Sequence, residues 1–211
     1  MSARDDVLGR IRDALGAGAA VAEVPRAYDG AGAGAPAGDP EVVARFCERA
    51  AEYRASVRRV ASGELTEAIA DAFAEHGAHR VAVAPDAPRS GDAIERVADD
   101  PPLTPRDLDG LDGVLTGCAA AIAETGTIVL DGGPRSGRRV LTLVPDLHVC
   151  VVDEADVHDR VPDAIAALAD AAREGLPLTL VSGPSATSDI ELERVEGVHG
   201  PRTLVILVVG S

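Results

Sequence analysis

The chain has 211 residues, and 46% of them are apolar, which is enough for one domain with a sizeable core. Its 35 acidic residues outnumber its 20 basic ones and give a net charge of -15. This balance excludes the basic surface that binds nucleic acid and argues against binding to an anionic membrane. All 20 basic residues are arginine, so the chain has no Schiff-base or Walker A lysine. Arginine, backbone N–H groups or hydroxyls must therefore hold any phosphate or carboxylate.

No segment of the sequence is typical of a membrane or secreted protein. No apolar run approaches the roughly 20 residues of a transmembrane helix, and the polar residues 1–6 lack the apolar core of a signal peptide. We therefore expect a cytoplasmic protein. The three cysteines, Cys47, Cys118 and Cys150, form no CxxC pair. We expect neither disulfides nor a cysteine-bound iron–sulfur cluster or zinc ion on this chain.

The first 80 residues are predicted to be mainly helical. Residues 3–15 carry apolar side chains at helical spacing. Residues 16–40 are rich in alanine, glycine and proline, which is typical of a flexible arm. In residues 41–60, apolar residues recur at steps of three and four, which predicts an amphipathic helix. A second helix is expected to follow the break at 62–63 and to end at Gly77.

From residue 80 onward, predicted strands and helices alternate. The connection between the strands at 127–130 and 139–144 is too short for a helical crossover, so we expect them to be antiparallel. The strands at 178–182 and 203–209 are almost entirely apolar, which predicts central positions in a sheet. The pattern indicates an α/β fold, a mixed Rossmann-like sheet flanked by helices. The other expected strands are 80–84, 113–118 and 148–152, and the expected helices are 91–98, 119–124 and 162–173.

The first candidate motif is Glu124-Thr125-Gly126-Thr127, at the start of a predicted strand. It offers a carboxylate beside a tight turn, together with two hydroxyls and backbone N–H groups. Glu124 is therefore a candidate catalytic residue, and the other three are candidate ligand-binding residues. Alternatively, Glu124 only ends a helix, Gly126 supplies a positive φ, and the threonines begin the strand.

The second motif, residues 182–191, follows a strand that is predicted to be buried. In open α/β sheets, ligands bind beyond the carboxyl ends of strands. Hydroxyls and turn N–H groups suit an anion such as phosphate or carboxylate, whereas the two acidic residues would suit a cation or a sugar hydroxyl. The alternative is a polar loop with helix-capping residues. The candidate ligand-binding residues are Ser182, Gly183, Ser185, Thr187 and Asp189.

The third motif, residues 197–201, places His199 between glycines on a constrained turn. His199 is a candidate catalytic residue, although a lone histidine is more often structural. His148 opens another strand and would line the same mouth of the sheet as a ligand-binding residue. No two of the candidate histidines and acids have helical metal-ligand spacing, so we expect no metal site. Arg139, one of three clustered arginines, either clamps an anionic ligand or faces solvent.

All three motifs are polar and flank apolar strands, so they must emerge at sheet ends. Ser182 follows its strand, whereas Thr127 and His199 precede theirs. The motifs therefore meet at one end of the sheet only if the 127–130 strand runs antiparallel to the 178–182 strand, a condition that extends to the 203–209 strand if His199 joins the same end. An acid, a histidine and several hydroxyls would then form a pocket for a small hydroxylated anion.

Taken together and in this order, the motifs resemble the lactate utilization protein C family, whose domain is called LUD. The resemblance rests on Ala-Glu-Thr-Gly-Thr at 123–127, Pro145-x-x-His148, Ser-Gly-Pro-Ser-x-Thr-x-Asp-Ile-Glu at 182–191 and Gly-Val-His-Gly-Pro at 197–201, and extends from Asp5 to Val209. It implies a fold like that of the NagB/RpiA/CoA-transferase group, with 5-formyltetrahydrofolate cyclo-ligase as a distant relative. Residues 1–40 would then form an N-terminal helix and arm, and residues 41–211 a single LUD-type domain.

The resemblance also implies a role in oxidising L-lactate to pyruvate together with iron–sulfur partner subunits, and it carries over no catalytic residue. Because this chain has no clustered cysteines, any cluster would lie on another polypeptide. The chain would then be an accessory subunit that binds a small carboxylate or a nucleotide-like anion. Two alternatives are a free-standing acyl- or CoA-transferase-like enzyme that uses Glu124, and a regulatory protein that binds a metabolite without catalysis.

Overall fold

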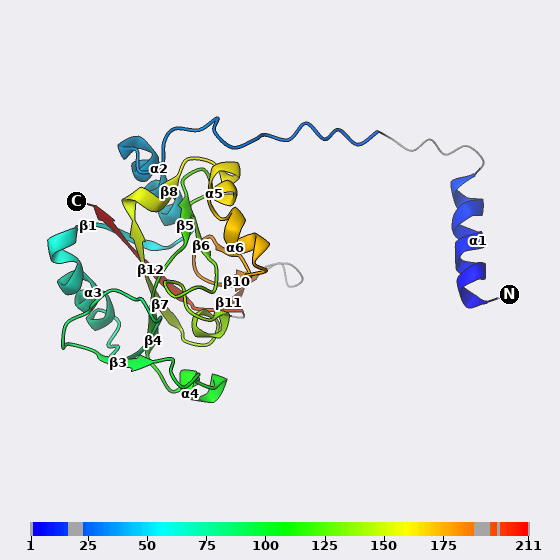
Figure 1. The fold of residues 1–211 in the computed structure, drawn as a ribbon. Helices are drawn as coiled ribbons and strands as arrows, with labels where there is room; N and C mark the ends of the chain where they lie inside the picture. The colour runs from blue at the N-terminus through cyan, green and yellow to red at the C-terminus, as the bar shows by residue number, and fades with distance from the viewer. Residues whose placement is uncertain (1, 17–22, 188–194, 198, 211) are drawn as a thin grey trace.

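The fold consists of two main β-sheets and the helices that cover them (Figure 1). The computed structural model describes residues 2–16, 23–187, 195–197 and 199–210. Within these residues, six parallel strands form a central sheet in the order β1-β12-β7-β4-β2-β3. Their bounds are β1 Ser56–Ala61, β2 Arg80–Val83, β3 Glu95–Ala98, β4 Gly113–Gly117, β7 Leu147–Asp153 and β12 Thr203–Gly210.

A smaller, mixed sheet has the order β8-β5-β6-β9. Strand β6 is antiparallel to both of its neighbours, and β5 is parallel to β8. The strands are β5 Ala120–Ile122, β6 Thr127–Leu130, β8 Val157–His158 and β9 Thr179–Val181, and a separate antiparallel hairpin pairs β10 Ala186–Thr187 with β11 Val195–Glu196. The predicted fold class, a mixed α/β arrangement flanked by helices, is confirmed.

The central sheet is buried on both faces, which explains its apolar strands. The helices are α1 Ala3–Leu15, α2 Pro40–Glu52, α3 Leu65–Ala74, α4 Pro105–Asp109, α5 Val161–Ala167 and α6 Ala169–Arg173, with 3-10 turns η1 Ser62–Glu64, η2 Arg139–Thr142 and η3 Glu154–Asp156. Phe73 of α3 packs with Val149 and Val205 on one face. Phe46 of α2 packs with Cys150 on the other face, together with the smaller sheet.

Helix α1 lies apart from the two sheets (Figure 1). Its Val7, Ile11 and Leu15 are exposed. From Asp29 onward the chain contacts the body: Arg160 pairs with Asp29 at 2.7 Å, and Gly38 N donates to Val157 O at 3.0 Å. Residues 29–38 are thus bonded to the domain, where the composition predicted a loosely packed arm. No helix in the described parts of the chain is long and apolar enough to span a membrane.

The single helix predicted for residues 41–60 is wrong in its second half. Helix α2 ends at Glu52, Arg54 takes a positive φ of 69°, and β1 begins at Ser56. Val57 and Val60 fit a helical stripe, but β-branched residues also suit a strand, and pairing with β12 decides between the two.

Four further elements differ from prediction, and in two of them long-range strand pairing overrides local preference. Residues 95–98 and 120–122 form strands where helices were expected, and residues 139–142 form a 3-10 turn where a strand was expected. The antiparallel partners of β6 are therefore β5 and β9. Strand β9 lies at an edge of the smaller sheet, with Leu180 51% exposed, and is not central.

Candidate functional site

The antiparallel pairing of β6 and β9 brings the first two motifs together. Ile128 pairs with Val181, so the start of β6 lies beside the end of β9. The hydroxyl oxygens of Thr127 and Ser182 are 2.6 Å apart, and those of Thr125 and Thr127 are 2.7 Å apart. This is the strand direction that the convergence of the motifs required.

Two glycines allow these loops to pack closely against the C-terminal end of α2. Gly126 has a φ of 61°, and a Cβ there would lie 2.4 Å from the backbone nitrogen of Ala50. Gly183 has a φ of 84°, and a Cβ there would lie 2.2 Å from the carbonyl oxygen of Tyr53. Only glycine fits both positions, so Gly126 has a packing role against α2.

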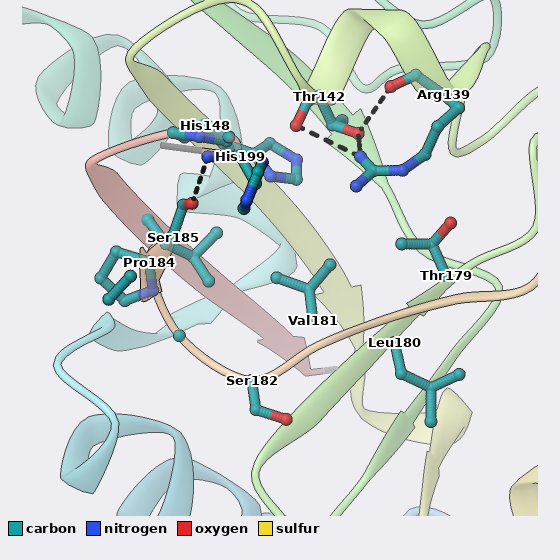
Figure 2. A pocket seen from close by; sticks show the side chains of 15 residues that line it. Arg139, Thr142, His148, Thr179, Leu180, Val181, Ser182, Pro184, Ser185 and His199 are labelled. Atoms are coloured by element: carbon teal, nitrogen blue, oxygen red, sulfur yellow. Dashed lines mark hydrogen bonds between the residues drawn. The ribbon is translucent and has the colours of Figure 1, made fainter. Parts of the chain in front are cut away.

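A pocket of about 230 Å³ lies at the carboxyl end of β9 and the amino ends of β7 and β12 (Figure 2). For the central sheet this is the opposite end from the one where open α/β sheets usually bind ligands. Figure 2 shows Arg139 and Thr142 on one side and His148, His199 and Ser185 on another. The residues that line it are Arg139, Thr142, His148, Thr179, Leu180, Val181, Ser182, Gly183, Pro184, Ser185, Ala186, His199, Gly200, Pro201 and Leu204.

Arg139 is the cation of this pocket. Its guanidinium donates to Thr142 Oγ1 at 2.8 Å, and no carboxylate among the described residues forms an ion pair with it. Its neighbours differ, because Arg138 binds Asp99 through two hydrogen bonds of 2.6 Å and Arg135 binds Asp156 at 2.7 Å. Burial lowers the pKa of Arg139, but arginine keeps its charge in proteins. The positive charge of Arg139 therefore faces the pocket without a negatively charged partner among the described residues.

His148 is one of two buried polar residues that line the pocket, the other being Thr142. The His148 side chain is 2% exposed, and its Nε2 is hydrogen-bonded to Thr116 Oγ1 of β4 at 2.8 Å. Thr116 is fully buried. Interactions with Cys118, His148 and Thr116 lower the pKa of Cys150, the next residue on this face of β7.

Ser185 fixes the turn that carries His199. Its Oγ accepts a hydrogen bond from His199 N at 3.1 Å, its N–H donates to Pro201 O at 2.8 Å, and its carbonyl accepts from Gly197 N at 2.9 Å. The His199 side chain is exposed at the rim of the pocket. This arrangement leaves His199 free to contact a ligand in the pocket.

The structure does not bring Glu124 into this pocket. Glu124 lies in a separate cleft with Arg45, Arg49, Asp159 and Arg160. Its Oε2 accepts a hydrogen bond from Val161 N at the start of α5, at 3.3 Å. The expected combination of Glu124 with His199 is therefore absent from the described residues, because the β5–β6 turn directs the two threonines and Glu124 to different neighbours.

The remaining predicted ligand-binding residues belong to the loop after β9. Thr187 lies in β10, where its backbone pairs with Val195. Asp189 lies outside the described residues. Within those residues, no three His, Cys, Asp or Glu side chains form a group that could hold a metal ion.

Sequence reasoning missed Thr116 and Thr142. Thr116 is the one hydroxyl in the otherwise apolar segment Val114-Leu115-Thr116 and is fully buried. A buried polar side chain needs a hydrogen-bonding partner. This requirement would have predicted from the sequence that Thr116 contacts another polar group.

Comparisons with known proteins place this architecture in a family. The family model described as LUD domain matches residues 43–209. The chain is 47% identical over 176 residues to lactate utilization protein C of Deinococcus radiodurans, covering 83% of each chain. It is 38% identical over 101 residues to an uncharacterized protein of Neisseria meningitidis serogroup B, covering 47% of this chain and 42% of that protein.

A solved structure is also similar. The crystal structure of a DUF162 family protein from Deinococcus radiodurans matches with a TM-score of 0.69 and 42% identity, covering 81% of this chain and 97% of that one. The sequence match and the structural match both extend over most of the chain. The chain belongs to the LUD domain family.

Proposed function

We propose that this chain serves lactate utilization as a non-redox subunit that acts with iron–sulfur partner proteins, and that its pocket binds a small carboxylate. The name of the relative that is 47% identical over most of both chains supports the role in lactate utilization. The support for a carboxylate ligand comes from the pocket itself.

The observation that carries the proposal is the guanidinium of Arg139. A partly buried cation is costly unless an anion accompanies it. The described residues supply no carboxylate for Arg139, whereas they supply one for Arg135 and one for Arg138. A bound carboxylate would complete the pair, and Ser182 and Ser185 line the same pocket.

The non-redox assignment rests on the cysteines. The chain has three, whereas a cluster ligated only by cysteine takes four thiolates. Cys118 and Cys150 are both buried within one apolar core, and Cys47 is half-buried on α2. Electron carriers of that kind would therefore reside on partner proteins.

Equilibrium binding tests the proposal. We expect sodium L-lactate and sodium pyruvate to bind the purified chain in isothermal titration calorimetry. Arg139→Gln should weaken binding by at least about tenfold, the usual effect of losing one charge-assisted hydrogen bond. Arg138→Gln is the matched control, because its side chain lies outside the pocket and should leave the affinity unchanged. No binding of either acid, or equal affinity in Arg139→Gln, would reject the carboxylate site.

The transferase alternative has less support. Glu124 is exposed and lies in a cleft without a histidine or a hydroxyl among its described lining residues. A nucleophilic carboxylate needs a substrate carbonyl held beside it. The carboxylate pocket and Glu124 therefore do not form one active centre.

A further inference from the structure

The hydrogen-bonded pair of Thr116 and His148 lies beneath the pocket and has no part in holding a carboxylate on Arg139. We propose that His148, oriented by Thr116, donates a hydrogen bond to an uncharged oxygen of the ligand. The pocket then selects carboxylates that also carry a hydroxyl or carbonyl group over plain carboxylates. This inference rests on the proposed carboxylate site at Arg139.

The pair is held by two interior strands of the central sheet. His148 is the second residue of β7 and pairs with Val114, while Thr116 pairs with Cys150. Thr116 and His148 are thus diagonal neighbours on one face of adjacent strands. Both are buried, at 0% and 2% exposure. Strand pairing on both sides of β4 and β7 fixes the position of the imidazole.

The second ring nitrogen of His148 is available to a ligand. Nε2 is bonded to Thr116, and among the described residues no nitrogen or oxygen atom is hydrogen-bonded to Nδ1. Within those residues, the one buried side-chain oxygen or nitrogen without a partner is Asp163 Oδ2. Nδ1 is therefore accessible, and His148 lines the pocket. A histidine that is 98% buried presents its free nitrogen to the cavity.

The surroundings of Thr116 determine the tautomer. Thr116 Oγ1 is hydrogen-bonded to His148 Nε2 and also interacts with the thiol of Cys150, its partner across β4 and β7. A buried hydroxyl must donate its proton to avoid an uncompensated desolvation cost. Because the thiol sulfur is a weak acceptor and the imidazole nitrogen is the stronger one, Thr116 donates to Nε2, which leaves the proton of the neutral imidazole on Nδ1. The pocket presents an N–H donor, which matches the acceptor oxygen of a hydroxyl or carbonyl group.

Such a donor discriminates against a ligand that lacks the oxygen. A plain carboxylate would displace water from Nδ1–H and leave that donor unpaired. L-lactate and propanoate form the matched pair of probes, since they differ only by the hydroxyl. We expect the wild-type chain to bind L-lactate at least about tenfold more tightly than propanoate.

Two variants of Thr116 separate orientation from simple packing. Thr116→Val has nearly the same shape without the hydroxyl, and Thr116→Ser keeps the hydroxyl. The lactate-to-propanoate affinity ratio should fall toward one in Thr116→Val and be restored in Thr116→Ser. Arg139→Gln should weaken both acids together. Melting temperatures of all variants show whether each is folded.

Nitrogen-15 NMR of the imidazole provides a readout that packing alone does not change. The five histidines are distinguished by loss of one signal in His148→Gln. We expect the Nδ1–H tautomer in the wild type and in Thr116→Ser, and its loss in Thr116→Val. An Nε2–H tautomer in the wild type, or equal affinity for the two acids, would overturn this inference and leave the Arg139 site standing. Failure of both acids to bind would overturn the proposed function and this inference together.

Discussion

The hydroxyl oxygens of Thr127 and Ser182 lie 2.6 Å apart although 55 residues separate them in sequence. The bond joins the start of β6 to the end of β9 at the point where the chain enters the pocket. Thr127 is 2% exposed, so water does not compete strongly for its hydroxyl. The position of the Ser182–Ser185 loop therefore depends on a side chain of another strand.

This pair should show energetic coupling. Thr127→Val and Ser182→Ala should each lower the free energy of unfolding by about 1 kcal/mol. Because each single change already breaks the shared bond, the double variant should lose less than the sum. Urea unfolding of the four proteins measures the coupling, and strictly additive losses would show that the bond contributes nothing.

Gly126 should be far more sensitive to substitution than a glycine with the same backbone conformation in open space. Gly126 and Gly77 have φ values of 61° and 65°, but a Cβ at Gly77 meets nothing within 4 Å. Gly77→Ala should cost about 1–2 kcal/mol from backbone strain. Gly126→Ala adds the collision with α2 and should cost more than about 3 kcal/mol. Thermal unfolding of both variants is the measurement, and similar losses would mean that α2 moves aside freely.

The Asp99–Arg138 pair should contribute stability that is lost in acid. Hydrogen bonding to Arg138 holds the pKa of Asp99 below its ordinary value. A lowered folded pKa means that the contribution is present above the unfolded value, about 3.9, and disappears as the pH falls through the folded value. Arg138 is 44% exposed, so solvent screening limits the loss in Arg138→Gln to about 1 kcal/mol near neutral pH.

Urea unfolding at a series of pH values tests this sign. The difference between wild type and Arg138→Gln should shrink below about pH 4, where Asp99 becomes protonated in the unfolded state and then in the folded state. A difference that grows toward acid would contradict the assignment.

The three thiols should differ in reactivity. Cys118 and Cys150 are buried, whereas Cys47 is partly accessible. Burial raises the pKa of Cys47, so its thiolate fraction should still be rising above about pH 9. Mass spectrometry after iodoacetamide treatment should find Cys47 labelled first, and the other two only after unfolding. Equal labelling of all three in the native protein would contradict this order. Visible absorption of the purified chain that depends on cysteine would contradict the expectation that these cysteines bind no cluster.

The division of the chain into residues 1–40 and 41–211 stays a prediction that proteolysis can test. Trypsin cleaves only after arginine here, since the chain lacks lysine, and Arg26 is the one arginine between residues 16 and 40. Arg26 is exposed and precedes the segment bonded to the body. The first stable product should begin at Ala27. Early cleavage at an arginine between residues 128 and 152 would refute the domain assignment.

The sequence predicted elements whose local pattern agrees with their final environment. Strands β7 and β12 are apolar runs buried on both faces, and α3 has one apolar stripe. In each case the spacing of the apolar residues predicts the same element that their burial requires. The prediction for residues 56–61 was wrong because their pattern suits either a helix or a strand. Pairing with β12, which is distant in sequence, favours the strand. The kinship with the NagB/RpiA/CoA-transferase group remains an expectation from resemblance.

The candidate site was predictable as residue types but not as an arrangement. The sequence identified Arg139, His148, Ser182, Ser185 and His199, which line one pocket. It could not separate Arg139 from its neighbours, because the difference lies in the carboxylates that fold back onto Arg135 and Arg138. Nor could it exclude Glu124 from the pocket, because that depends on which way a turn faces.

The place of β12 also governs when this protein can fold. Strand β12 lies between β1 and β7, and among the described residues β1 pairs with no other strand. Ser56 pairs with Val205, so until residues 203–210 dock, β1 has no partner among the described strands and β7 has an open edge. The central sheet can therefore close only when these distant segments meet, and such pairing is slow. Until β12 docks, the edges of β1 and β7 must be kept from pairing with other chains.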